Sequence, residues 1–129
     1  MYNLFDLPAQ EFSSLRGKTL KAITALRDRE GGEVHQLEFL TDTGEKLILG
    51  HAQDCCESVY LADVVGDLAD LVGQPILRAE EAVSTETDED GDRTRWSFYK
   101  LATRSGYVDL RWLGRSNGFY SEAVELFVA

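Results

Sequence analysis

The stretch His51–Val59, HAQDCCESV, is the most unusual segment of this 129-residue chain. Seven of its nine residues are polar or ionisable, yet apolar residues lie directly on both sides of it, at 47–49 and 59–61. Exposed loops are usually built from Gly, Pro, Ser and Lys instead. Polar groups that become buried need hydrogen-bond partners, because each unpaired one costs about 1–3 kcal/mol. We therefore expect this stretch to form a polar centre of the fold and a candidate ligand site.

Strand-like segments surround the stretch. Upstream, residues 18–27, 34–41 and 45–50 are apolar segments separated by turn residues, which predicts an antiparallel meander. His35, Leu37 and Phe39 share one face of the second segment, and a regular third segment would point His51 inward. Further strands are expected at 58–65, 75–82, 95–103, 107–113 and 120–128. The last two flank Asn117-Gly118, a pair typical of a β-hairpin turn.

Two short helical segments are also expected. In residues 1–16, Pro8 fits a first helical turn and Gly17 a stop, which predicts a short N-terminal helix packed as a lid. Residues 66–73 fit one or two helical turns that end at Gly73. Strands and helices do not alternate as in βαβ units. The predicted class is α+β, mainly antiparallel β, with about eight short strands in a sheet, small barrel or sandwich. The length predicts a single domain, 1–129.

The charge of the chain is concentrated in one segment. The formal net charge is −10, which argues against direct nucleic-acid binding, since such surfaces need clustered Lys and Arg. Residues 79–92 hold seven acidic residues and no Lys or Arg. We interpret Ser84 to Asp92 as an acidic, solvated loop that tolerates length variation. Its spacing does not fit a calcium-binding loop.

Targeting features and cysteine usage indicate a cytoplasmic protein. No apolar run approaches the ~20 residues of a membrane span, so no membrane association is expected. The N-terminal residues lack the basic and apolar regions of a signal peptide. The only cysteines, Cys55 and Cys56, are adjacent and cannot cross-link distant segments, so a disulfide framework is excluded. A cytoplasmic location in a bacterial or infected host cell follows.

Two blocks of sequence carry a family resemblance. Residues 51–81, HAQDCCESVYLADVVGDLADLVGQPILRAEE, contain an H-x-Q-D-C-C-E motif. Residues 96–126, WSFYKLATRSGYVDLRWLGRSNGFYSEAVEL, contain F-Y-K-x-A-T and W-x-G-x-S-N-G-x-Y-S elements. Both resemble an uncharacterised family of small proteins, a domain of unknown function, encoded in bacteriophage and bacterial genomes. That family usually has Tyr where this chain has Phe119, a change that removes one hydroxyl.

The resemblance implies a phage or prophage setting and a shared polar frame, but no activity. We expect the two blocks to fold against each other, so that their polar side chains meet inside the molecule. The residues of the frame are His51, Gln53, Asp54, Cys55, Cys56, Glu57, Asp63, Asp67, Tyr99, Thr103, Trp112, Ser116, Asn117, Tyr120 and Ser121.

Metal binding and nucleophilic catalysis are weakly supported. A structural zinc site needs four Cys or His ligands in spaced pairs, whereas adjacent cysteines point to opposite sides of a strand. We therefore expect no metal and no other cofactor, with one cysteine filling the core and the other shielded by an aromatic ring. Cys55 or Cys56 could act with His51 or His35 as a Cys–His site, but no known nucleophile motif is present.

Carboxylates are the remaining candidates for chemistry. The acids Asp54, Glu57, Asp63 and Asp67 could form a general acid–base pair. The alternative, favoured for at least one of Asp54 and Glu57, is that the carboxylate accepts backbone amides and clamps an irregular turn. No phosphate-binding glycine motif is present. Arg111 or Arg115 beside the Asn117 turn is a weak candidate for an anion site.

Three functional hypotheses remain. The leading one is a small acidic binding protein without catalysis that sequesters a small ligand or blocks a host protein through a polar pocket, as a phage counter-defence factor would. The alternatives are an acidic inhibitor that mimics nucleic acid, and a Cys/His-dependent hydrolase or transferase. Exposed strand edges would allow a homodimer. The predicted ligand-binding residues are His51, Gln53, Asp54, Cys55, Cys56, Glu57, Trp112, Ser116, Asn117 and Tyr120.

Overall fold

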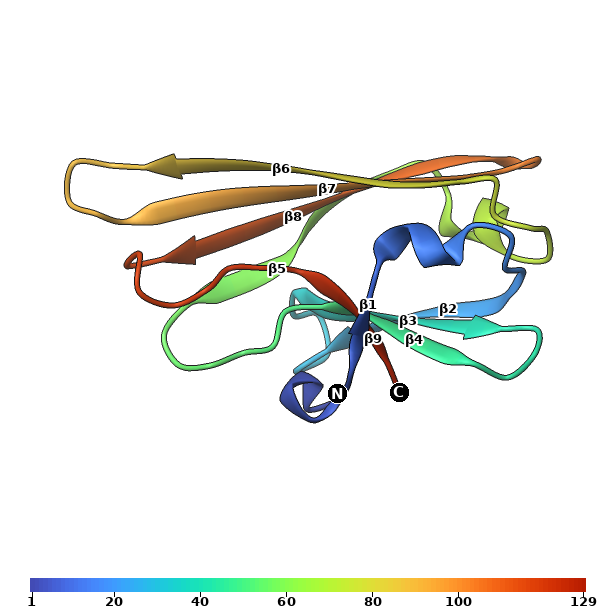
Figure 1. The fold of residues 1–129 in the computed structure, drawn as a ribbon, viewed down its shortest axis with the longest axis horizontal. Helices are drawn as coiled ribbons and strands as arrows, with labels where there is room; N and C mark the ends of the chain where they lie inside the picture. Colours follow the sequence, from blue (N-terminus) through green and yellow to red (C-terminus); the bar gives the residue numbers. More distant parts are fainter.

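The chain forms one antiparallel sheet of nine strands, seen in a computed structural model that describes residues 1–129 (Figure 1). The strands are β1 (Ala9–Gln10), β2 (Leu20–Arg27), β3 (Val34–Thr41), β4 (Lys46–Gly50), β5 (Ser58–Val65), β6 (Arg78–Thr87), β7 (Arg93–Thr103), β8 (Gly106–Ser116) and β9 (Glu125–Val128). Three short 3-10 turns complete the fold, at η1 (Leu4–Asp6), η2 (Phe12–Leu15) and η3 (Leu68–Leu71).

The sheet curls into a half-barrel. Its strand order is β1-β9-β4-β3-β5-β8-β7-β6, with β2 paired to β3 beside this path. Figure 1 shows β6, β7 and β8 in one layer and β2, β3, β4 and β9 in the other. The two layers meet where Val34 of β3 pairs with Leu61 of β5. Because β6 and β1 pair with one neighbour each, the barrel is not closed between them.

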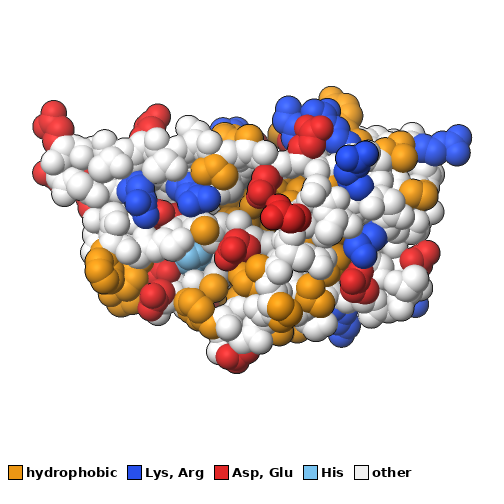
Figure 2. Space-filling view, in the orientation of Figure 1, with side chains coloured by type: hydrophobic (Ala, Val, Ile, Leu, Met, Phe, Trp, Pro, Cys, Tyr) orange, Lys and Arg blue, Asp and Glu red, His pale blue; other side chains and the backbone are white.

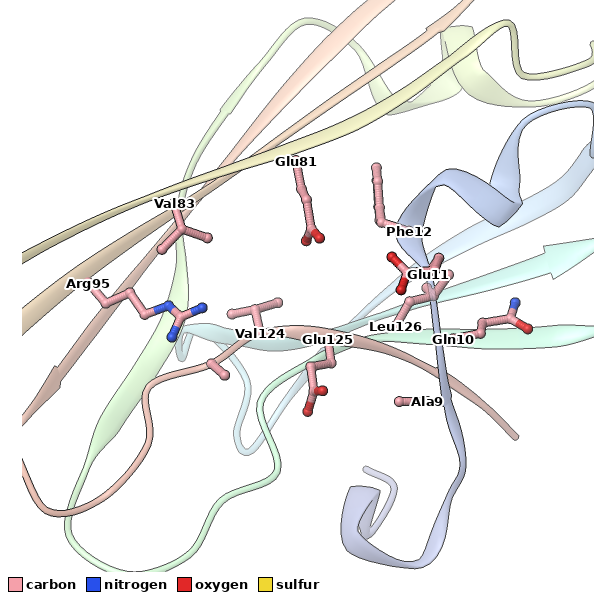
Figure 3. A pocket seen from close by; sticks show the side chains of 11 residues that line it. Ala9, Gln10, Glu11, Phe12, Glu81, Val83, Arg95, Val124, Glu125 and Leu126 are labelled. Atoms are coloured by element: carbon pink, nitrogen blue, oxygen red, sulfur yellow. The ribbon is translucent and has the colours of Figure 1, made fainter.

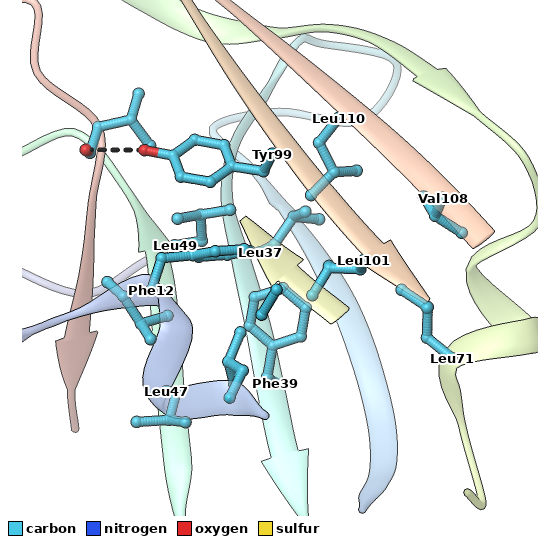
Figure 4. Close-up of a cluster of buried hydrophobic side chains, with 14 of the residues drawn as sticks. Phe12, Leu37, Phe39, Leu47, Leu49, Leu71, Tyr99, Leu101, Val108 and Leu110 are labelled. Carbon is cyan, nitrogen blue, oxygen red and sulfur yellow. Dashed lines mark hydrogen bonds between the residues drawn. The ribbon is translucent and has the colours of Figure 1, made fainter. Parts of the chain in front are cut away.

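The main core lies between the two layers (Figure 4). Alternation along β3 and β8 places Leu37, Phe39 and Trp112 in it, and all three are fully buried. The Tyr99 hydroxyl, on β7, donates a hydrogen bond of 3.0 Å to the Val124 carbonyl. This buried contact connects the upper layer to the segment that leads into β9.

A smaller apolar cluster lies on the other face of the lower layer. Leu4, Ile48 and Phe127 form it, with Tyr2, Leu7 and Ala52 packed around them. The N-terminal segment therefore covers the outer face of β4. As a result β4 is buried on both faces, which explains its continuous apolar sequence, Leu47-Ile48-Leu49.

The predicted antiparallel β class is confirmed, but the helical part of the prediction is wrong. The strands predicted at 34–41 and 58–65 have those bounds in the structure. In place of an N-terminal helix, residues 1–16 form two 3-10 turns separated by β1. The 66–73 segment holds a single 3-10 turn. The Asp67 side chain caps this turn by accepting a hydrogen bond from the Ala69 amide. The fold is therefore largely β rather than α+β. No helix is long and apolar enough to cross a membrane.

Two turn predictions also differ from the structure. Gly118 has a positive φ of 89°, as expected for a turn, but the chain does not fold back on β8. Instead β9 crosses to the other layer and pairs with β4 and β1, because both edges of β8 are already occupied by β5 and β7. In the acidic segment, β6 continues to Thr87, so that the turn itself is confined to residues 88–92.

Candidate functional site

A buried histidine–glutamate pair closes the HAQDCCE segment. The His51 Nε2 atom lies 2.7 Å from Oε2 of Glu57, and the two side chains are 5% and 0% exposed. The His51 Nδ1 atom lies 2.6 Å from the carbonyl oxygen of Ala123. Both ring nitrogens face acceptors, which an imidazole protonated on both nitrogens satisfies. The pair ties residues 51–57, here called the CCE loop, to the segment before β9.

The Glu57 carboxylate receives four hydrogen bonds. Besides His51, its donors are the backbone amides of Asp54 and Cys55, at 3.0 and 2.9 Å, and Nε2 of Gln53, at 3.1 Å. Burial alone would raise the pKa of the Glu57 carboxyl, but the bonds from His51 and from the two backbone amides lower it to about 2. The expectation that a carboxylate clamps an irregular turn is confirmed for Glu57.

Both cysteines lie on the outside of the CCE loop. Cys55 and Cys56 are exposed and joined to each other by a disulfide. The expectation that one cysteine fills the core was wrong, because the two bonds from the Asp54 and Cys55 amides turn this part of the loop away from the core. The bond links adjacent residues and therefore closes no long loop, in agreement with the exclusion of a disulfide framework.

A second buried carboxylate, Glu122, organises the end of β8. Its side chain is 0% exposed. Arg93 Nε donates to both of its oxygens, at 3.0 and 2.8 Å, and Ser116 Oγ donates to Oε2. Burial acts to raise the pKa of Glu122, but the bonds from Arg93 and Ser116 hold it below its usual value. Ser116 Oγ also accepts the Gly118 amide, so Glu122 fixes the turn at residues 116–120, here called the SNG turn.

The backbone of β8 approaches Glu122 closely at Gly114. A Cβ atom at Gly114 would lie 2.6 Å from Cβ of Glu122. Gly114 pairs with Val59 of β5, and the next pair, Ser58 with Arg115, brings the CCE loop beside the SNG turn. The two sequence blocks therefore fold against each other as expected, through the pairing of β5 with β8. Their polar side chains, which were expected to meet, do not form one shared centre. They form two separate buried centres, one at Glu57 and one at Glu122.

A surface cleft of about 450 Å³ lies between the CCE loop and the SNG turn. We call it the SNG cleft. It is lined by one residue of the CCE loop and by residues of β5, β7, β8 and the acidic turn. These are Cys56, Ser58, Asp88, Asp92, Arg93, Thr94, Arg115, Ser116 and Asn117.

Two further hollows flank the CCE loop. One, of about 350 Å³, is lined by His51, Gln53 and Glu57 together with His35 and other residues near β3. A smaller one, of about 140 Å³, includes Asp54. Seven of the ten predicted ligand-binding residues are therefore distributed among three hollows, whereas Cys55, Trp112 and Tyr120 line none of the three.

The other residues of the predicted frame mostly have local structural roles. Trp112 is fully buried in the core and its indole nitrogen has no hydrogen-bond partner. The Tyr120 carbonyl accepts a long bond of 3.4 Å from Arg93. The remaining members cap turns or pair with a neighbour: Asp63 with Arg111, Asp67 with Ala69, Thr103 with Asp70 and Ser105, Asn117 with Phe119, and Ser121 with Ala123.

Sequence reasoning missed Arg93 and Glu122. Both lie outside the motif positions, Arg93 before the second block and Glu122 directly after Ser121. The sequence held one indication of Glu122: it is an acidic residue inside the segment 120–128, which was predicted to form a strand. Its partner could not be identified without the pairing of β7 with β8, which places Arg93 opposite Ser116.

The site offers no free nucleophile–base pair. Both thiols are joined to each other, both ring nitrogens of His51 are engaged, and the Glu57 carboxylate is fully occupied by donors. These contacts give a Cys–His hydrolase no support. The structure contains no group of three or more His, Cys, Asp or Glu side chains placed to hold a metal ion.

Comparison with known proteins gives one match. A family model described as a domain of unknown function, DUF7448, matches residues 13–126. No curated protein matches the chain, and no solved structure does.

Proposed function

This chain belongs to the DUF7448 family, a domain of unknown function, and we propose that it is a binding protein without catalysis that holds a small polar ligand in the SNG cleft. The observation that carries the proposal is that this cleft, of about 450 Å³, is lined by both family segments. Its volume falls within the usual range of small-molecule sites, about 300–1,000 Å³.

The walls of the SNG cleft are held in place by buried contacts. Glu57 fixes the CCE loop through two backbone amides, and Glu122 fixes the SNG turn through Ser116 and Arg93. A site whose walls are fixed before binding loses little conformational entropy when a ligand enters. The two carboxylates therefore support binding by preparing the cleft, although neither contacts the ligand.

The lining of the SNG cleft indicates the chemistry of the ligand. Arg115 and the part of the Arg93 guanidinium that Glu122 and Tyr120 leave unbonded offer donors, whereas Asp88 and Asp92 offer carboxylate acceptors. Hydroxyl and amide groups add further donors and acceptors between them. A small molecule that carries both hydrogen-bond donors and acceptors, with charges of both signs or none, fits this lining better than a simple anion or an apolar compound.

The biological setting is part of the same proposal. The resemblance to a family encoded in phage and bacterial genomes supports a role in the cytoplasm of a bacterial or infected cell. In that setting, sequestration of a small host molecule would serve counter-defence. The acidic segment supports a second role, in which the chain blocks the basic surface of a host protein, because β6 and the turn after it carry seven exposed acidic residues.

Native mass spectrometry tests the ligand proposal. The full chain is purified without denaturation from phage-infected cells, beside Thr94→Trp, which fills the cleft, and Lys21→Trp, which places the same side chain on exposed β2. We expect the wild type and Lys21→Trp to retain a non-protein mass that Thr94→Trp loses. Bare protein in all three samples, or equal retention by Thr94→Trp, contradicts the proposal.

A further inference from the structure

The two edges of the half-barrel face a common cavity. β6 ends the sheet on one side and β1 on the other. A cavity of about 650 Å³ lies between them, lined by Ala9 and Gln10 of β1 and by Glu81 and Val83 of β6, among others (Figure 3). It shares no residue with the SNG cleft. Figure 2 shows acidic and apolar side chains together near the middle of this face.

The β6 strand has an unusually open edge. Its ten residues pair with β7 in unbroken register, from Arg78 opposite Ala102 to Thr87 opposite Arg93, and with no other strand. All of them except Ala79 are exposed. Natural edge strands are protected by shortness, proline, bulges or charged side chains. β6 is long, free of proline and regular in register, so its protection past the first residues comes from its charges, which are mainly acidic. Past its first residues, which η2 covers, its outer backbone groups are free to pair with an added strand.

The cavity between the edges has unsatisfied donors. Nε of Arg95 and Nε2 of Gln10 are both buried without a hydrogen-bond partner, one on each side of the cavity. Backbone carbonyl groups of an inserted strand would provide acceptors for both. The apolar lining, formed by Phe12, Val83, Val124 and Leu126, would contact alternate side chains of that strand.

The charge of this region selects the partner. Three carboxylates, Glu11, Glu81 and Glu125, line the cavity against a single cation, Arg95. Glu80 and Glu86 add negative charge on the outer face of β6. Pairing β6 with β6 of a second copy would bring like charges together, which is unfavourable. A strand rich in Lys or Arg would instead be attracted along the whole edge.

We propose that the free edge of β6 binds an extended basic segment of a partner protein, which adds to the sheet as a tenth strand and closes the half-barrel toward β1. Cations of the segment lie beside Glu81, Glu80 and Glu86. Its apolar residues lie beside Val83, and its carbonyl groups accept from Arg95 and Gln10. This mode is β-strand addition, in which the backbone provides affinity and the side chains provide specificity.

The test uses a fluorophore-labelled seven-residue peptide of Lys with Val at its central position, and the full chain. With the central Val beside Val83, the lysines lie beside Glu81 on the inner face and beside Glu80 and Glu86 on the outer face. Fluorescence anisotropy should show binding by the wild type. Glu81→Arg should weaken binding at least tenfold, whereas Glu89→Arg, which makes the same charge change on the exposed acidic turn, should weaken it less than threefold. Two further peptides carry N-methyl groups, one on its odd-numbered residues and the other on its even-numbered residues. Only one of the two should lose binding, because only one set of amides faces β6.

Hydrogen exchange of the same complex gives a second readout. Binding should slow the exchange of alternate amides within residues 81–87. The proposal is overturned if the wild type does not bind the peptide, or if Glu81→Arg and Glu89→Arg weaken binding equally. It is also overturned if both N-methylated peptides still bind, or if the wild type forms a dimer that pairs through β6.

Discussion

The Nε2 atom of His51 lies 2.7 Å from Oε2 of Glu57, inside a loop whose two cysteines are exposed. The CCE loop thus combines a buried ion pair with an exposed disulfide. The contact joins the residue that follows β4 to the residue that precedes β5, and the Ala123 carbonyl extends it to the segment before β9. The contact therefore links the two ends of the CCE loop to a segment 72 residues further along the chain.

Replacing Glu57 by Gln should destabilise the protein by about 3 kcal/mol, since buried charged hydrogen bonds and a buried ion pair are lost together. The new amide group would also place donors against His51 and the backbone amides. Urea denaturation measures the change. Glu89→Gln, on the exposed acidic turn, is the matched control and should shift stability by less than about 0.5 kcal/mol. Similar changes in the free energy of unfolding for the two variants would show that the Glu57 carboxylate does not stabilise the loop.

Stability should fall in acid because of the same carboxylate. The pKa of Glu57 is about 2 in the folded protein, against an ordinary value of 4.5. A lowered folded pKa means that its contribution is fully present above pH 4.5 and is lost as the pH falls toward 2. Glu122, whose pKa is also lowered, acts in the same direction. Urea midpoints measured from pH 7 to pH 3 should fall more steeply in the wild type than in Glu57→Gln, and parallel curves would contradict this assignment.

Gly114→Ala should cost about 2 kcal/mol through overpacking. The added methyl group would lie 2.6 Å from Cβ of Glu122, an atom close to the backbone that cannot move aside. Gly106→Ala, in the same strand, is the control. Its methyl group would lie closest to a carboxylate oxygen of Asp70, at 2.7 Å, which can rotate away, and the Asp70 Cβ atom is farther off, at 3.3 Å. Thermal unfolding of both variants checks the difference, and an undiminished Tm for Gly114→Ala would refute the close packing of Glu122.

Removing the disulfide should change stability little. The double variant Cys55→Ser, Cys56→Ser breaks a bond between adjacent residues, and stabilisation by a disulfide in the chain-entropy model grows with the length of the loop that it closes. We expect a change of less than about 1 kcal/mol in urea. In the wild type, both thiols should react with iodoacetamide after mild reduction without denaturant. Protection of either thiol would contradict their exposure.

The strands were predictable wherever one local pattern governed them. Alternation along β3 predicted its bounds and its buried face, because Leu37 and Phe39 pack on the core, although His35 on the same face is only half-buried. The N-terminal helix failed because Phe12 and Leu15 are buried by tertiary contacts with the core and not by a helical stripe. The SNG turn formed as predicted, but β9 pairs elsewhere. Turn residues determine local geometry and not which strand the next segment joins.

The candidate site was predictable only in part. The sequence pattern places polar residues beside buried strands, and this identified Glu57 and its role as a clamp. Glu122 has no motif of its own, since its burial depends on Gly114 and on Arg93 across two strands. Trp112 was grouped with the polar frame, whereas alternation along β8 alone places it in the core with Val108 and Leu110. The burial of Glu122 depends on which strands lie side by side, and the motifs do not contain that information.

The role of the His51–Glu57 pair is tested most directly by an NMR spectrum of the His51 ring in the ¹⁵N-labelled full chain. The contacts with Glu57 and Ala123 predict that both ring nitrogens carry protons, and that these protons show cross-relaxation to the Asp54 amide and to Ala123. The Glu57→Gln variant should lose the Nε2 proton signal. A ring with one protonated nitrogen in the wild type, or one without contact to Ala123, would contradict a CCE loop held by this pair.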